Sequence, residues 1–228
     1  TYKIGSMNTD EDFHGVISSG VTHDSRKGRS NIVKEGDGYW RLTNSSNRYL
    51  GTTTINEGTL IVNGKHITDK DWDANGNHSP VIPGAYTIND KGTLAGTGNI
   101  LTTRVTVKNG GSISPGDINI ANFTVEAPVA FESGSSLIVR VDKTSNRNGR
   151  LIVKNSSLSF NGDVHMFLEE GEYEVGDIFV IFSASSYTGQ VGEIYPETPG
   201  SGLLWDTSEL LTRGRIKVVE NSTNIKDV

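Results

Sequence analysis

The stretch Gly58-Thr59-Leu60-Ile61-Val62-Asn63-Gly64 decides the fold, because shorter versions of it recur along the chain. Each version begins with glycine and continues as a short run of strand-forming residues. The others begin at Gly15, Gly38, Gly92, Gly111 and Gly134. All intervals between successive glycines lie close to one another except the one from Gly58 to Gly92, which is much longer. Such a regular recurrence, with a period of roughly 20 residues, indicates a repeat architecture.

A period of about 20 residues suits one coil of a parallel β-helix, built from about three short strands and the turns between them. A single coil cannot bury its own apolar side chains. Stacked coils can, with each rung hydrogen-bonded to the next at about 4.8 Å. Glycine at a constant place in each coil is expected, since tight corners need positive φ. The long interval from Gly58 to Gly92 is explained by an inserted loop at 65–83.

The local patterns agree with an all-β chain. Apolar β-branched residues alternate with polar ones in Arg104-Val105-Thr106-Val107-Lys108, which predicts a half-buried strand. No segment has a convincing helical pattern, and Ser208–Leu211 forms a single turn at most. A Greek-key sandwich is the rival all-β fold, because its strands are also closely spaced. The regular recurrence of the glycine-led strands favours the solenoid.

A more specific pattern lies in residues 13–17, 32–43 and 47–64. It consists of a Gly-x-Ile strand, a Lys-x-Gly-x-Gly turn, a Leu-Thr strand and two further motifs. The further motifs are Asn47-x-Tyr49-x-Gly51-x-Thr53 and Gly58-Thr59-Leu60-x-Val62-Asn63-Gly64. This order resembles the passenger-associated transport repeat, also called the autotransporter-associated β-strand repeat. The likeness extends over most of residues 4–219, and residues 65–83 and 142–149 depart from it.

The resemblance implies a right-handed parallel β-helix in a protein that is secreted to the bacterial cell surface and associated with the outer membrane. We expect residues 1–142 to form the repeat coils, with the inserted loop at 65–83. Residues 143–228 are expected to be less regular and to close the C-terminal end of the β-helix. Trp205, with Leu203, Leu204 and Leu210, is the predicted apolar plug. A plug has a physical role, because an uncovered last rung exposes a strand edge that promotes aggregation.

Composition excludes several classes of protein. The 228 residues carry a net charge of −6, and the 21 basic residues are scattered, so we expect no nucleic-acid partner. The absence of cysteine excludes disulfide scaffolds, thiol catalysis and cysteine-based zinc sites. No apolar run approaches the ~20 residues of a membrane helix, so the chain is not expected to span a membrane. A hydrophobic fraction of 34% fits a thin, elongated core.

The inserted loop contains the best candidate for a metal site. Asp71, Asp73 and Asn75 precede Gly76 in the order Asp-x-Asp-x-Asn-Gly, which is the first half of a calcium loop. Oxygen ligands at alternate positions can converge on calcium in a tight turn. The twelfth position is Ile82 and not an acid, so a complete EF-hand is excluded. An irregular calcium site and a polar turn without metal are the two interpretations, and no other cofactor is expected.

No group of residues has the pattern of an active site. The paired carboxylates Glu11-Asp12 and Glu169-Glu170 are adjacent in sequence, whereas acid–base catalysis needs two carboxylates that face one cleft. Four aromatic residues are consistent either with sugar stacking or with packing along the β-helix, and packing is favoured. They are Tyr39, Tyr49, Trp72 and Tyr86.

Three functions are consistent with these patterns. The first is a non-catalytic, passenger-like segment that acts as a rigid stalk, as a scaffold for secretion and folding, or as an adhesive surface. A polysaccharide or a host surface glycan would be its partner. The second is the C-terminal part of a β-helical polysaccharide-degrading lyase or hydrolase, and the third is a carbohydrate-binding module. Fold alone does not separate them. We expect the chain itself to be no enzyme, because no cleft with acidic or basic residues on successive rungs can be assembled.

Overall fold

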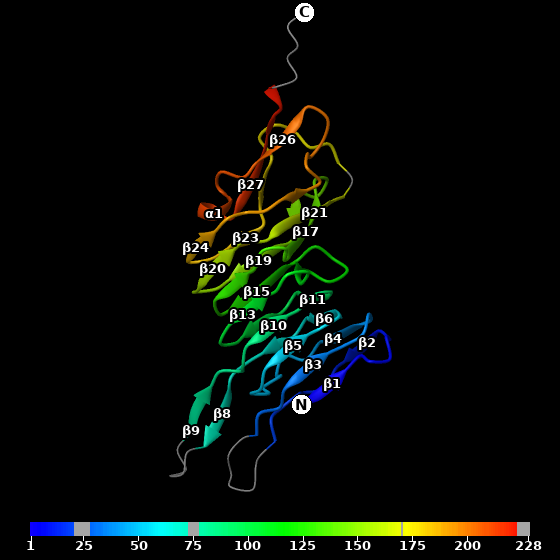
Figure 1. The fold of residues 1–228 in the computed structure, drawn as a ribbon, viewed down its shortest axis with the longest axis vertical. Helices are drawn as coiled ribbons and strands as arrows, with labels where there is room; N and C mark the ends of the chain where they lie inside the picture. The colour runs from blue at the N-terminus through cyan, green and yellow to red at the C-terminus, as the bar shows by residue number, and fades with distance from the viewer. Residues whose placement is uncertain (21–27, 73–77, 170, 223–228) are drawn as a thin grey trace, which may run out of the picture.

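The structure is a computed structural model that describes residues 1–20, 28–72, 78–169 and 171–222, with the backbone alone for residues 70–72, 78 and 79. Three long sheets of parallel strands run side by side along one axis (Figure 1). The chain passes through the sheets in turn and returns one rung further along at each pass. This is the parallel β-helix predicted from the sequence, and the Greek-key alternative is wrong because successive coils pair in parallel.

The first and second sheets extend over the whole stack. The first sheet contains, in spatial order, β1 (Tyr2–Ile4), β3 (Ile32–Lys34), β5 (Thr53–Ile55), β10 (Tyr86–Ile88), β13 (Val105–Val107), β16 (Val129–Phe131), β20 (Ser157–Phe160) and β24 (Ser186–Gly189). The second contains β2 (Glu11–Phe13), β4 (Tyr39–Leu42), β6 (Gly58–Val62), β11 (Gly92–Gly96), β14 (Ser112–Pro115), β17 (Ser136–Asp142), β21 (Asp163–Leu168) and β25 (Ile194–Tyr195).

The third sheet is shorter. It contains, in spatial order, β7 (Lys65–His66), β12 (Asn99–Leu101), β15 (Asn122–Glu126), β19 (Arg150–Val153) and β23 (Phe182–Ser183). Towards the N-terminus it continues as two isolated parallel bridges, Asn47 with His66 and Ser18 with Arg48. All three sheets therefore follow the same order of coils.

The register gives the length of each coil. Tyr39 pairs with Thr59, and Thr93 pairs with Ser112, so each of these coils inside the stack takes about 20 residues, within the range of solenoid repeats. The terminal coils are longer. Glu11 pairs with Trp40 and Val164 with Ile194, which makes each of these coils about 30 residues long. The period predicted from the glycines therefore holds for the central coils and is wrong for the outer ones, whose turns are longer.

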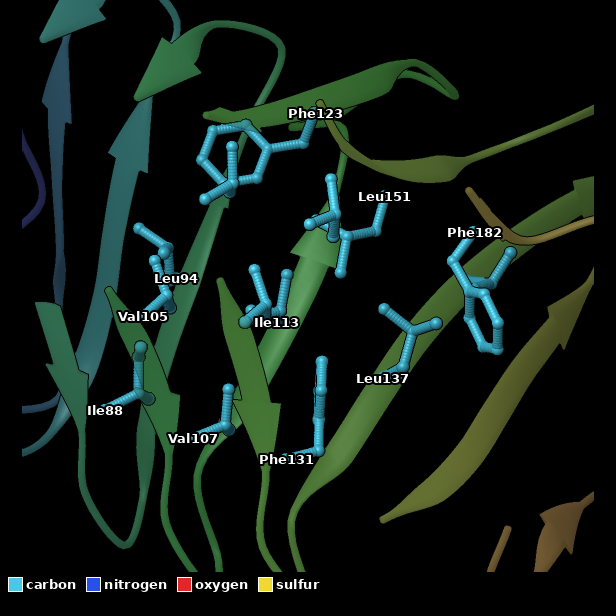
Figure 2. Packing of buried hydrophobic residues seen from close by; sticks show 14 of the residues in the cluster. Ile88, Leu94, Val105, Val107, Ile113, Phe123, Phe131, Leu137, Leu151 and Phe182 are labelled. Carbon is cyan, nitrogen blue, oxygen red and sulfur yellow. The ribbon is translucent and has the colours of Figure 1, made fainter. Parts of the chain in front are cut away.

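Buried side chains form columns along the inside of the stack (Figure 2). In the first sheet, parallel register aligns one apolar side chain from each of five successive rungs. The column consists of Ile55, Ile88, Val107, Phe131 and Phe160, each at most 1% exposed. Full burial of such a side chain stabilises by about 1.5–3 kcal/mol. Together with the buried side chains of the other sheets, this column belongs to one apolar cluster that extends from Ile32 to Val218, and a core this narrow fits the low hydrophobic fraction.

Glycine begins the second-sheet strands because neighbouring coils come very close there. Gly58 pairs with Gly92, and Gly58 has φ +64°. A Cβ atom on Gly58 would lie 2.3 Å from the carbonyl oxygen of Gly36, and one on Gly92 would lie 2.5 Å from that of Ile55. Both separations are shorter than van der Waals contact. The predicted strands from Gly38 onward all lie in this sheet.

The prediction for Gly15 is wrong. The strand of that coil is β2 (Glu11–Phe13), which pairs with β4 in the register Phe13 with Leu42. The Phe13 ring packs against Trp40, with 5.7 Å between the ring centroids, and this contact decides which residues of β2 face the core. The backbone N–H of Ile17 donates to the side chain of Asn47 and takes no part in a ladder. The glycine period marked the turn after this strand.

Two hairpins interrupt the coils. β8 (Asp69–Trp72) and β9 (His78–Val81) pair antiparallel and project away from the stack (Figure 1). β18 (Arg147–Asn148) folds back on the end of β17, with Asp142 opposite Arg147. Both hairpins fall in segments that depart from the repeat pattern, and the rungs on either side of each keep their register.

The C-terminal end is closed by antiparallel strands and one helical turn. β27 (Arg215–Glu220) pairs with β22 (Ile178–Val180) and β26 (Leu203–Asp206), and α1 (Leu210–Arg213) packs against β24. Figure 1 shows these elements at the end of the stack opposite β1. The C-terminal cap of the predicted fold is thus present. No helix among the described residues is long and apolar enough to cross a membrane.

The predicted plug was partly wrong. Leu210 is fully buried, but Leu204 is 37% exposed. Leu203 and Trp205 are half-buried, with Trp205 edge-on to Phe179 at 6.3 Å. The core is closed by four buried side chains, namely Phe179, Leu210, Ile216 and Val218. Alternation in β27 turns Ile216 and Val218 inward, whereas β26 lies outside β27 and so keeps its side chains nearer the solvent.

Candidate functional site

Lys34, the lysine of the Lys-x-Gly-x-Gly turn, lies inside the β-helix. Its side chain is fully buried, and its ammonium group donates hydrogen bonds to three backbone carbonyls. These belong to Glu35 at 2.9 Å, Gly36 at 2.6 Å and Glu57 at 3.2 Å. Glu35 and Gly36 are in the turn of the lysine's own coil, and Glu57 is in the same turn of the next coil. Lys34 therefore ties two coils together. Desolvation lowers its pKa, against the attraction of nearby carboxylates such as Glu57.

The second motif directs all four of its marked residues inward. Asn47 is buried, accepts from the backbone N–H of Ile17 at 3.0 Å and donates to the carbonyl of Asn44 at 2.9 Å. A Cβ atom on Gly51 would lie 2.1 Å from the carbonyl oxygen of Ser30 in the preceding coil. Tyr49 and Thr53 are fully buried and share a hydrogen bond of 2.7 Å. Each motif position thus has a contact that depends on its residue type.

Thr53, Tyr49, Tyr86 and His66 form a buried chain of hydrogen bonds. His66 contacts the Tyr49 carbonyl through Nε2 at 2.8 Å and the Tyr86 hydroxyl through Nδ1 at 2.7 Å. The two tyrosine hydroxyls are 3.0 Å apart. A carbonyl only accepts, so the proton of neutral His66 is on Nε2, and Nδ1 accepts from Tyr86. It follows that Tyr49 donates to Tyr86 and Thr53 donates to Tyr49, so every proton in the chain has an assigned direction.

Burial of this chain changes its titration. Desolvation lowers the pKa of His66 to about 4, although the hydrogen bond to the Tyr49 carbonyl acts in the opposite direction. Burial raises the pKa of Tyr49 to about 12. The His66 ring also stacks on Tyr49 at a centroid distance of 4.0 Å. All these groups are therefore neutral at pH 7, and none is exposed to a substrate.

An arginine clasp lies on the outside of the second sheet. Arg41 in β4 donates to both carboxylate oxygens of Asp117, at 2.7 and 3.2 Å, and also binds Asp12 at 2.5 Å. Asn63 adds a hydrogen bond of 2.9 Å to Asp117. Asp117 follows β14, so the clasp spans the rungs from β4 to β14. Burial acts to raise the pKa of Asp117, but the bonds from Arg41 and Asn63 hold it below its usual range.

We expect Asp117→Asn to lower the free energy of unfolding by about 1–2 kcal/mol, because a charge-assisted, two-pronged bond between rungs is lost. Urea unfolding measures the change. Glu132→Gln is the matched control, since Glu132 pairs with Lys108 between side chains that are each 45% exposed. That control should change stability by less than about 0.5 kcal/mol. Equal effects of the two substitutions would show that the clasp contributes nothing beyond surface charge.

The calcium candidate falls largely outside what the structure describes. Asp73 and Asn75 lie outside the described residues. Asp71 is in β8, where its backbone is paired with Ser79 of β9. Within the described residues no group of three or more histidine, aspartate or glutamate side chains is placed to hold a metal ion. Calcium binding by Asp71, Asp73 and Asn75 therefore stays a prediction.

The other candidates from the sequence are placed as follows. Tyr49 and Tyr86 are buried, so sugar stacking is wrong for them and the packing interpretation is confirmed. Tyr39 lies beside Arg41, whose guanidinium is 4.5 Å from the ring centroid. Asp12 is engaged by Arg41, and the side chain of Trp72 lies outside the described part of the chain. None of the described side chains in this set is brought together with another carboxylate around a cleft.

Sequence reasoning did not identify the roles of Lys34, His66 and Arg41. The motif pattern marked Lys34 as a signature position without indicating that its ammonium is enclosed by carbonyls. His66 follows shortly after the repeat, and only the parallel bridge from Asn47 brings it beside Tyr49. Arg41 and Asp117 are 76 residues apart. Their contact could be predicted only from the length of every coil between them, including the coil that contains the inserted loop.

Comparison with known proteins agrees with this geometry. Residues 32–62 match the family model described as the passenger-associated-transport-repeat. Over 94 residues, or 41% of the chain, the sequence is 34% identical to the adhesin BmaC autotransporter of Brucella suis biovar 1 (strain 1330). The matched part spans 2% of the length of that protein. The matched repeat holds the strands and turns that bind Lys34 and Tyr49. Residues 32–62 therefore contain a passenger-associated transport repeat, and the two likenesses support a non-catalytic passenger segment of a secreted, cell-surface bacterial protein.

Proposed function

We propose that the chain is a rigid, non-catalytic stalk segment of an adhesin associated with the outer membrane, which holds adhesive surface away from the cell. The observation that carries this proposal is the continuous parallel stacking of the first sheet from β1 to β24 and of the second sheet from β2 to β25, with the third sheet beside them from β7 to β23. Every coil is tied to its neighbours by backbone ladders and by a common core. Such an object resists bending and presents the same outer faces repeatedly.

The alternative functions have less support. A polysaccharide lyase or hydrolase needs acidic or basic residues converging on one cleft. Carboxylates such as Glu132 and Glu126 instead pair with single lysines, Lys108 and Lys154, along the stack. The adhesin name of the matched relative favours binding over catalysis. We also propose that residues 1–142 form the repeat coils and that residues 143–228 form the closing region. The antiparallel elements of the cap, β22, β26 and β27, all lie in this second part.

Deletion of one complete coil tests the stalk proposal. Val105 and Val129 occupy equivalent register positions, so deletion of residues 105–128 joins two rungs that have the same geometry. We expect a folded protein shortened by one rung, about 4.8 Å, with unchanged display on the cell surface. Small-angle scattering and surface labelling measure the two properties. A deletion of half a coil, residues 105–116, joins positions that are not equivalent, breaks the register and should not fold.

The outcome separates the candidate functions. A stalk tolerates loss of one coil, because each coil contacts only its neighbours. An enzyme that uses side chains on several successive rungs would lose its activity. Release of unsaturated or reducing sugar from polygalacturonate by the intact chain, abolished by the deletion, would contradict the proposal.

A further inference from the structure

The segment that departs most from the repeat also concentrates positive charge. Residues 140–150 contain Arg140, Lys143, Arg147 and Arg150 with a single acid, Asp142, in a chain of net charge −6. Lys143 forms an ion pair with Asp177. Among the described residues, no ion pair joins a carboxylate to any of the three arginines. Elsewhere on the described surface, Arg41, Arg213 and Arg215 have acidic partners, whereas Arg29, Arg48 and Arg104 form no ion pair with a described residue, so the adjoining cleft and not the missing ion pairs distinguishes this segment.

Two of these arginines, Arg147 and Arg150, line the cleft where the third sheet meets the hairpin and the cap. The cleft has a volume of about 580 Å³ and lies between the start of β15, the β17–β18 hairpin and β22. Arg150 begins β19 and lies in register beside Asn122, at the start of β15 (Figure 1). Arg147 comes from β18 and donates a hydrogen bond of 3.0 Å to the carbonyl of Ile120, which also lines the cleft. Arginines from two different elements thus line one cleft.

The hydrogen-bonding state of Arg150 indicates a missing partner. Its Nε is buried, and no acceptor for it lies among the described residues. A buried donor without an acceptor is costly, and proteins usually satisfy such groups with a ligand or water. Asp142 is the carboxylate whose charge interacts with Arg147, but its oxygens are engaged by the backbone N–H and hydroxyl of Ser145. The cleft therefore offers donors and positive charge, and no carboxylate is among the residues that line it.

The rest of the lining suits a sugar. Asn122 and Asn146 are exposed, and Asn148 is held by two carbonyls, those of Gly149 and Val180, at 2.8 Å each. Exposed amides can bind hydroxyl groups as donors or acceptors. A small apolar wall adds a surface on which the C–H face of a pyranose ring can pack. It is made by Ile178, which is 45% exposed, and by Val180.

We propose that this cleft binds an acidic saccharide, specifically a hexuronate residue whose carboxylate is held by Arg147 and Arg150. A guanidinium fork matches a planar carboxylate with two parallel hydrogen bonds. The asparagine amides bind the ring hydroxyls, and Ile178 and Val180 pack against the ring. The inference deepens the proposed adhesive function by naming a class of ligand, and its test requires neither surface display nor an intact parent protein.

Isothermal titration of the whole chain with four oligosaccharides tests this assignment. Tetragalacturonate and a hyaluronan tetrasaccharide carry carboxylates, a sulfated malto-oligosaccharide carries charge without carboxylate, and maltotetraose is neutral. We expect at least one uronate to bind, more weakly at physiological ionic strength than at low salt because the pairing is electrostatic. Which uronate binds distinguishes a plant-type from an animal-type source. Absence of binding by both uronates would overturn the proposal.

Variants locate the site. Arg150→Gln should weaken uronate binding by about tenfold or more, and Arg150→Lys less, because lysine keeps the charge without the fork. Arg104→Gln removes an exposed arginine outside the cleft and should leave the affinity unchanged. If Arg150→Gln does not fold by circular dichroism, Arg147→Gln takes its place, since the side chain of Arg147 is exposed. Equal losses in the Arg104 variant, or equal binding of the sulfated malto-oligosaccharide, would show general charge attraction and overturn the assignment.

Discussion

Lys34→Met should lower the free energy of unfolding by about 3–5 kcal/mol, even though methionine has nearly the same shape and is apolar. The substitution removes the ammonium group that donates to the backbone carbonyls of Glu35, Gly36 and Glu57. Among the described residues, it is the only charged donor to these three carbonyls. Those carbonyls then stay buried without the partner that satisfied them. Urea unfolding followed by circular dichroism measures the loss.

Lys154→Met is the control for this substitution. Lys154 pairs with Glu126 at 3.1 Å, but half of its side chain is exposed, so the pair should contribute less than about 1 kcal/mol. If Lys34→Met is as stable as the unsubstituted chain, the lysine of the motif is not a tie between coils. If both variants lose the same amount, general loss of charge explains the result.

His66 should make the chain lose stability between about pH 6.5 and pH 4. An unfolded histidine has a pKa of about 6.5, whereas burial lowers the pKa of folded His66 to about 4. Between these values the unfolded chain binds a proton that the folded chain does not, so the free energy of unfolding falls as the pH falls. The contribution of this residue amounts to about 3 kcal/mol and ends below the lower value.

The test compares the chain with His66→Gln by urea unfolding at pH 7 and at about pH 4.5, where roughly 2–3 kcal/mol of the effect has developed. Glutamine does not titrate, so this variant should lack that part of the pH dependence, although it is less stable at pH 7. Carboxylates with lowered pKa values, such as Asp117 and Glu126, affect both proteins equally and lose their contribution at more acidic pH. Identical pH dependence of the two proteins would contradict burial of a neutral His66.

Much of the fold was predictable because coils approach closely at the second sheet, which favours glycine at one register position. Gly38, Gly58, Gly92 and Gly111 occupy that position, and Ser135 takes it in the following coil. Gly58 and Gly92 are in register for that reason, and the strands after them alternate as expected. The first coil does not follow this glycine pattern, because the position of β2 is set by packing of Phe13 on Trp40 and not by Gly15. The contact between Phe13 and Trp40 cannot be predicted from the local sequence pattern, because the two residues belong to different coils.

The side-chain arrangement was less predictable. Tyr49, His66 and Tyr86 come from three different strands or turns, and the inserted loop between His66 and Tyr86 hides their spacing. The plug could not be placed from hydrophobicity alone, since Leu204 and Val218 read alike in sequence and only the pairing of β26 outside β27 separates them. The cleft of Arg147 and Arg150 lies in the segment that departs from the repeat, where the pattern gives no guidance.

The most direct test of the stacked register is disulfide formation in this cysteine-free chain. Thr87 and Thr106 are parallel partners on the outer face of the first sheet, on adjacent rungs. Thr54 and Thr106 share that face, but Thr87 lies between them. Thr87→Cys with Thr106→Cys should oxidise readily, since adjacent rungs fit the Cα separation of a disulfide, whereas Thr54→Cys with Thr106→Cys should stay reduced. Equal oxidation of both pairs, or of neither, would contradict the parallel β-helix.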